Sequence, residues 1–223
     1  MPHFTKNSMP WFNFAKTAEY VVMSTTVDIC MFNFIPKVKE RKIKPVHFFL
    51  YALSKAQWEI PNFRLRIENG KPKEIDSLIC TYPVKNPHIE LNHSIINYQH
   101  DKGIATFTKE ALKSDHIAVN EKAAVSEPLT SNWFLASIAP FLDFTSSCPT
   151  VNYHGFCSPL FLASRFTIQG DSLSFKLNST LNSTLLNHFD LQNLVQKFTD
   201  NIADVDKLTN NNGHKKPLKN TIS

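Results

Sequence analysis

Short runs of alternating apolar and polar residues, separated by turn residues, form the most frequent pattern along the chain. Residues 63–68 alternate strictly and are followed by Asn69-Gly70, a pair that favours a tight turn between antiparallel strands. In residues 172–181, Leu173, Phe175 and Leu177 alternate with polar residues after the turn at Gly170-Asp171. Such alternation is typical of half-buried strands. Residues 20–31 are rich in β-branched residues, and residues 132–138 and 159–169 are typical of buried strands. Strands are expected at residues 20–31, 63–68, 73–76, 77–84, 89–98, 132–138, 159–169 and 172–181.

Other segments carry apolar residues at helical spacing. Pro45 suits the first turn of a helix, and Pro61 prevents that helix from continuing. Asn187 can cap a last helix that carries one apolar stripe. Helices are expected at residues 10–19, 45–60, 106–122 and 187–202. Because helices and strands follow one another without regular alternation, the order predicts an α+β fold with a mixed, mostly antiparallel sheet flanked by helices.

The composition is that of a packed globular protein. The 223 residues are 42% hydrophobic, with 18 Phe and only 5 Gly, so a core can form without metals or disulfides. We expect one domain at residues 1–205 and a polar, basic, disordered tail at 206–223. The four cysteines are too widely spaced for a zinc or redox motif and are expected to be buried, reduced thiols. They are Cys30, Cys80, Cys148 and Cys157.

Charge and hydropathy limit the classes of partner. Residues 1–12 lack the apolar core of a signal peptide, and no segment approaches the ~20 apolar residues of a membrane span, which predicts a cytoplasmic protein. The net charge is +5, partly from residues 37–44 and 207–219. This excess is either a solvated basic surface or an attraction for an anionic ligand, such as a coenzyme phosphate or a nucleotide. Binding of duplex nucleic acid is not expected, because the sequence shows no recognition helix and no aromatic stacking motif.

Five segments resemble those of the chloramphenicol acetyltransferase family and occur in the same order. They are residues 25–29, 60–70, 137–146, 158–161 and 169–171. The resemblance covers about residues 8–203. It implies the family's α+β fold, a homotrimer, acetyl coenzyme A as the acyl donor, and an active site at each subunit interface.

The family's hallmark is His-His-x-x-x-Asp-Gly, whose second histidine deprotonates the acceptor hydroxyl. Counted without gaps from residues 169–171, this motif falls on residues 182–188, so the resemblance puts Ser183 at the catalytic base and Asn187 at the aspartate. The arginine that the family pairs with that aspartate falls at about Ser8. A serine hydroxyl does not have the near-neutral pKa that a general base needs. The resemblance therefore implies a degenerate active site.

The remaining site residues are also carried over from the resemblance. Ser137 matches the serine that stabilises the developing oxyanion, whereas Leu162 replaces a threonine that helps to hold a water. The ligand cleft is expected to include Ser137, Phe141, His154, Leu162 and Ser183.

Two histidines are candidates for a replacement base. His154 lies in the loop 149–158, which lines the acceptor pocket in the family, and His188 stands at the start of the last helix. The sequence contains no Ser-His-Asp signature, no glycine-rich phosphate loop and no metal-ligand spacing. Metal chemistry is therefore not expected.

Three hypotheses remain. The first is a catalytically inactive chloramphenicol acetyltransferase-like trimer that binds a small ligand in its interface clefts. The second is an acyl-coenzyme A-dependent O-acetyltransferase that uses His154 or His188 as its base. The third is a trimeric scaffold for a partner protein, with the basic tail 206–223 as the contact segment.

Overall fold

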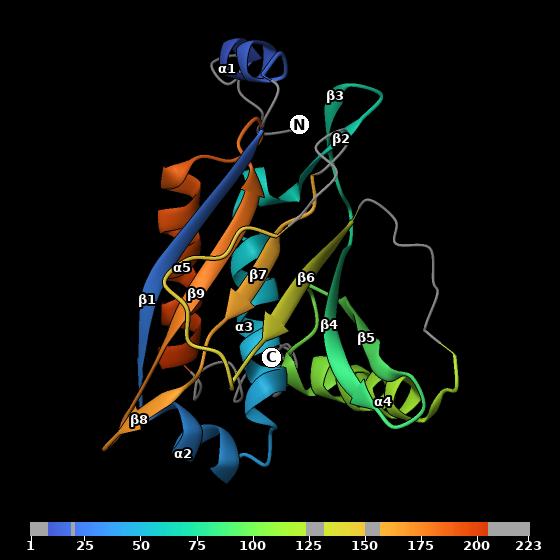
Figure 1. The fold of residues 1–223 in the computed structure, drawn as a ribbon, viewed down its shortest axis with the longest axis vertical. Helices are drawn as coiled ribbons and strands as arrows, with labels where there is room; N and C mark the ends of the chain where they lie inside the picture. Colours follow the sequence, from blue (N-terminus) through green and yellow to red (C-terminus); the bar gives the residue numbers. More distant parts are fainter. Residues whose placement is uncertain (1–8, 19–20, 124–131, 150–156, 205–223) are drawn as a thin grey trace, which may run out of the picture.

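A computed structural model describes residues 9–18, 21–123, 132–149 and 157–204. It has the predicted α+β architecture, in which one large mixed sheet carries three long helices on a single face (Figure 1). The predicted tail 206–223 and His154 lie outside the described residues.

The large sheet has the strand order β1-β9-β7-β6-β4-β5, and the short β8 pairs with β9. The pairs β4–β6 and β6–β7 are parallel, while the other pairs are antiparallel, as the predicted mixed sheet requires. The strands are β1 (Val22–Phe32), β4 (Leu78–Asn86), β5 (Glu90–Tyr98), β6 (Trp133–Ile138), β7 (Leu160–Ala163), β8 (Thr167–Gln169) and β9 (Ser172–Asn182).

A separate hairpin of β2 (Leu65–Glu68) and β3 (Lys71–Glu74) projects from the sheet (Figure 1). Its two turn residues, Asn69 and Gly70, have φ angles of 50° and 71°. A two-residue turn with positive φ at both positions matches the twist of antiparallel strands, and Asn-Gly is the preferred pair for it. The hairpin predicted from these residues is confirmed.

The helices are α1 (Met9–Ala15), α2 (Phe34–Glu40), α3 (Pro45–Trp58), α4 (Ile104–Asn120) and α5 (His188–Ala203), with a 3₁₀ turn η1 (Pro61–Arg64) after α3. Helices α3, α4 and α5 pack behind the sheet (Figure 1). The core joins α3, α5 and β9 through Phe49, whose ring centroid lies 5.1 Å from that of Phe198 and 5.8 Å from that of Phe175. Such tilted and edge-on aromatic pairs stabilise a core beyond the area they bury.

The prediction of one continuous strand at residues 159–169 is wrong, because the structure divides this segment into β7 and β8. Ala163 lies opposite Leu177, and Thr167 lies opposite Ser174. The segment from Ala163 to Thr167 is therefore one residue longer than the segment of β9 that it faces. The extra residue makes a bulge, and Ser164 stabilises it by accepting a hydrogen bond from the Lys176 amide on its Oγ (2.9 Å).

Two other features differ from the sequence predictions. Helix α2 was not predicted, and its Pro36 is tolerated because the first turn of a helix needs no amide donor. The prediction that all four cysteines are buried is wrong: all are free thiols, but only Cys80 and Cys157 are buried, while Cys30 and Cys148 are exposed. An alternating strand has one outward-facing side, which explains the exposure of Cys30 in β1.

Candidate functional site

Ser183 directly follows β9, where the chain passes β1. Its amide donates to the Val21 carbonyl oxygen (2.7 Å), and its hydroxyl donates to the same oxygen (3.0 Å). The Ser183 carbonyl accepts a hydrogen bond from the Trp11 indole Nε1 of α1 (3.0 Å). Hydrogen bonds from Ser183 thus connect the end of β9 to the start of β1 and to α1.

The neighbours of Ser183 form a tight turn. The Asn182 side-chain oxygen accepts hydrogen bonds from the Thr184 amide (2.8 Å) and the Thr184 hydroxyl (2.6 Å). Asn182 and Thr184 are both buried. Short polar side chains that bond the backbone two residues ahead favour turns, so these residues account for the sharp change of direction between β9 and α5.

Asn187 caps α5, as its sequence position predicts. Its side-chain oxygen accepts from the amides of Phe189 (2.8 Å) and Asp190 (3.1 Å), while its own amide donates to Asp190 Oδ2 (3.0 Å). Asn62 donates to the same carboxylate, at 3.1 Å from Oδ1. Burial raises the pKa of Asp190, and the hydrogen bonds from Asn187 and Asn62 oppose that shift. Asn187 and Asp190 therefore form a capping box, which gives Asn187 a structural role at the start of α5.

His188 is the first residue of α5 and is exposed. His188 is not among the described residues that line the pocket presented below.

The structure brings Ser137 and Leu162 together but separates both from Ser183. Ser137 of β6 lies opposite Leu162 of β7, and Leu162 lies opposite Asn178 of β9. Ser183 follows Asn178 by five residues, roughly 17 Å along a strand. Within one chain these residues cannot meet around one small ligand.

Phe141 lies in the segment that leaves β6 and crosses the open face of the sheet (Figure 1). Its side chain is 78% exposed. The same segment is held to β1 by Ser24, whose hydroxyl donates to the Ser147 carbonyl (2.6 Å). Phe141 thus points outward from a segment that is anchored to β1.

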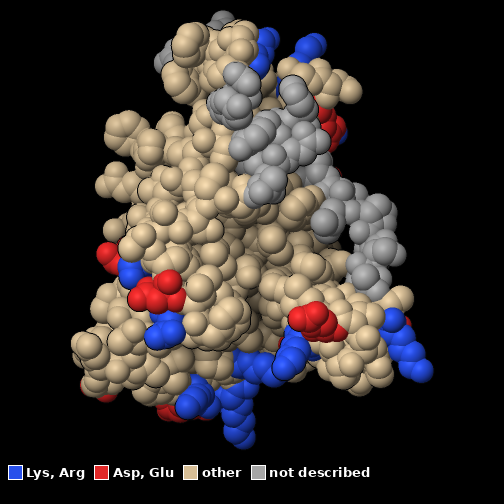
Figure 2. Space-filling view, viewed as in Figure 1, with Lys and Arg blue, Asp and Glu red and all other residues tan. Residues whose placement is uncertain are grey.

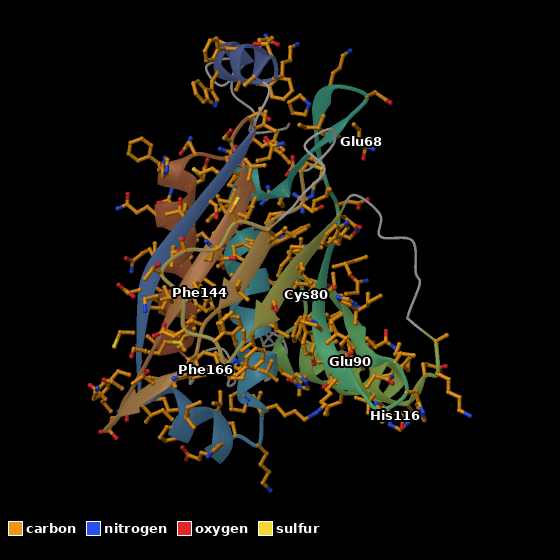
Figure 3. The ribbon with its side chains drawn as sticks, in the orientation of Figure 1. Glu68, Cys80, Glu90, His116, Phe144 and Phe166 are labelled. Atoms are coloured by element: carbon orange, nitrogen blue, oxygen red, sulfur yellow. The ribbon has the colours of Figure 1, made fainter. Side chains whose placement is uncertain are left out.

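A pocket of about 520 Å³ opens beside this segment. Ile138 and Pro140, which lie between Ser137 and Phe141 in the sequence, line it together with Phe34, Phe49 and Phe166, whereas Ser137 and Phe141 are not among its lining residues. Figure 3 shows Phe166 at the end of the sheet nearest α2, and Figure 2 shows the face hollowed in its lower middle, with Lys and Arg side chains below the hollow. Lys44 is the one charged residue among those described around the pocket.

Next to the pocket, Asp115 of α4 gathers polar groups from three other elements. Its Oδ2 lies 2.9 Å from His47 Nε2 of α3, and its Oδ1 accepts from Ser94 Oγ of β5 (2.9 Å) and from the Tyr82 hydroxyl of β4. Lys44 Nζ lies 3.4 Å from Oδ2. Burial alone would raise the pKa of Asp115, but the hydrogen bonds from His47, Tyr82 and Ser94 lower it to about 2.

Neither the pocket nor the Asp115 cluster was predicted from the sequence. The cluster joins residues 68 positions apart, such as His47 and Asp115, and no local motif signals such a contact. The basic segment 37–44, which ends at Lys44, is the one local feature of the sequence that points to this region.

The described residues contain neither a membrane-spanning helix nor a cluster of metal-binding side chains. No helix there is long and apolar enough to cross a bilayer. No group of three or more His, Cys, Asp or Glu side chains there could hold a metal ion.

The family model and the curated relatives that match this sequence carry the same description. A family model described as chloramphenicol acetyltransferase matches residues 3–202. A chloramphenicol acetyltransferase of Proteus mirabilis is 24% identical over 181 residues, which are 79% of this chain and 83% of that protein. One of Escherichia coli is 26% identical over 160 residues, which are 68% of this chain and 69% of that protein.

Solved structures share the fold. A chloramphenicol acetyltransferase superposes with a TM-score of 0.76 at 22% identity, covering 89% of this chain and 96% of the other. The cubic core of a pyruvate dehydrogenase multienzyme complex gives a TM-score of 0.67 at 13% identity, covering 94% and 92%. Because the family model matches most of the sequence, the chain belongs to the chloramphenicol acetyltransferase family.

Proposed function

We propose that this protein is a catalytically inactive member of the family that binds a small anionic ligand in the interface clefts of a homotrimer. The observation that carries the proposal is the position of Ser183. Its hydroxyl stands where the family resemblance puts the catalytic base, and it is engaged with the Val21 carbonyl.

The loss of the base is supported by the neighbouring positions. Asn187 is neutral and caps α5, and Leu162 offers no hydrogen-bonding group beside Ser137. A positioned base contributes typically 10²–10⁴-fold in rate. Without that base, an oxyanion donor at Ser137 would add little to the rate, because few acceptor hydroxyls would reach the tetrahedral intermediate. The exposed His188 is poorly placed to replace the base, and His154 lies outside the described residues.

A trimer would give the separated residues a common cleft. Ser183 lies about 17 Å along the sheet from the Ser137–Leu162 pair, so the Ser183 end of one copy can face the Ser137 end of another only if copies associate. We place the pocket lined by Ile138 and Pro140, which follow Ser137 in the sequence, in the same cleft. Its basic border favours an anion, and acetyl coenzyme A remains a candidate only through the family resemblance. A cytoplasmic location remains a prediction from the sequence.

Sedimentation and calorimetry test the trimer and the binding together. We expect three times the 25.5 kDa mass of one chain and saturable heat with at least one anion from a panel of coenzyme A, ATP and dodecanoate. Phe141→Ala should weaken that binding about tenfold, because we assign Phe141 as an aromatic anchor of the ligand, and truncation of such an anchor costs more than ~1 kcal/mol.

Phe189→Ala is the matched control, since Phe189 is 77% exposed and lies at the start of α5. It should leave binding unchanged. A monomeric mass, or no saturable heat with any of the three anions, would contradict the proposal.

A further inference from the structure

We propose that the pocket beside Lys44 takes an amphipathic carboxylate of the fatty-acid class, with its apolar chain among the phenylalanines and its carboxylate at Lys44. The inference rests on the proposed function, because it names the ligand class of the same cleft. It departs from the nucleotide-like and coenzyme-like ligands that the charge of the sequence suggested.

The lining of the pocket favours an apolar chain. Phe34, Phe49, Phe166, Ile138 and Leu173 surround the space with hydrocarbon. The only polar side chains among its described lining residues are those of Lys44 and Tyr82, and the Tyr82 hydroxyl donates to Asp115. A nucleotide base or a string of phosphates would lose water there without finding hydrogen-bond partners, and burying unsatisfied polar groups is costly.

The size of the pocket suits a long chain. At roughly 30 Å³ for each water-sized group, its 520 Å³ accommodate at most about 17 methylene-sized groups. Each methylene transferred from water improves binding about fourfold, so a chain of ten or more carbons gains most of its affinity from this lining.

Lys44 is available to a carboxylate at the rim. Its side chain is 55% exposed, and its contact to Asp115 is long, at 3.4 Å. Asp115 keeps His47, Ser94 and Tyr82 as hydrogen-bond partners when Lys44 turns away. Because an exposed ion pair of this kind contributes little, the ammonium can move to a ligand carboxylate at small cost.

The surroundings of Lys44 add a field that attracts anions. Residues 37–44 contain five basic side chains and one acidic side chain, Glu40. A fixed positive patch raises the local concentration of anionic ligands and their rate of association. One cation within the lining matches one carboxylate better than it matches a polyphosphate.

Displacement of a fluorescent fatty acid, 11-(dansylamino)undecanoate, from the full chain tests the proposal. Saturated carboxylates from 6 to 18 carbons should displace it with affinity rising about fourfold per methylene and levelling off before about 17 carbons. Lys44→Gln should weaken dodecanoate about tenfold and leave 1-dodecanol unchanged, because one charge-assisted contact is lost. Val46→Trp, which fills the pocket from α3, should abolish both.

Lys39→Gln is the matched control, because Lys39 belongs to the same basic segment but is absent from the pocket lining. It should leave dodecanoate binding unchanged, and urea unfolding of each variant checks that it folds. Affinity independent of chain length, or equal effects of Lys44→Gln and Lys39→Gln, would overturn the inference. Binding of coenzyme A or ATP without dodecanoate would overturn it while leaving the proposed function intact, whereas no binding by any anion would remove both.

Discussion

Replacing Asp115 with alanine is expected to lower the free energy of unfolding by about 1–3 kcal/mol, the cost of leaving buried hydrogen-bonding groups without their partner. Asp115 accepts hydrogen bonds from Tyr82 and Ser94 and contacts the fully buried His47. Without the carboxylate these groups lose their shared partner in a place that water reaches poorly. Urea unfolding of the two proteins measures the difference.

Asp143→Ala is the control for this experiment. Asp143 pairs with Lys176 at 3.1 Å, but its side chain is 64% exposed. An exposed pair is worth about 0–1 kcal/mol, so this variant should unfold almost as the unchanged protein does. Equal losses in both variants would mean that the Asp115 cluster does not stabilise the fold as described.

The same carboxylate predicts how stability depends on pH. Its pKa is about 2 in the folded protein, against 3.8 for an ordinary aspartate. Because the folded state lowers this pKa, the contribution of Asp115 is present above about pH 4 and is lost as the pH falls toward 2. The stability difference between the unchanged protein and Asp115→Asn should therefore shrink between pH 4 and pH 2. A difference that stays constant over this range would contradict the assigned ionisation.

Much of the local structure could be predicted because it depends on short-range signals. Asn69-Gly70 set the hairpin, Pro45 and Pro61 bracket α3, and Asn187 caps α5. Each of these residues restricts its own backbone or bonds to a neighbour, so its effect can be inferred without knowing the fold.

The features that were missed depend on contacts between distant segments. The bulge after β7 arises from pairing with β9, and the Asp115 cluster collects side chains from four elements. The distance between Ser183 and Ser137 likewise follows from strand register, which alternation alone does not give. The candidate site residues could be named from the family resemblance, but the distance between them could be derived only from the structure.

Transfer of an acetyl group to chloramphenicol is expected to be at least 10²–10⁴-fold slower than in ordinary enzymes, whose turnover is typically 1–10³ s⁻¹. Ser183 offers no group that accepts a proton near neutral pH, and its hydroxyl already donates to the Val21 carbonyl. Ser183→Ala should therefore leave the residual rate unchanged. A further fall in rate in that variant would assign Ser183 a chemical role that this account denies.

The most direct test is the rate of free thiol release from acetyl coenzyme A in the presence of chloramphenicol, measured for the unchanged protein, His154→Ala and His188→Ala. We expect all three rates to be equal and close to the rate without protein. Turnover by the unchanged protein within about tenfold of the ordinary range, lost in either histidine variant, would contradict the account and identify a replacement base.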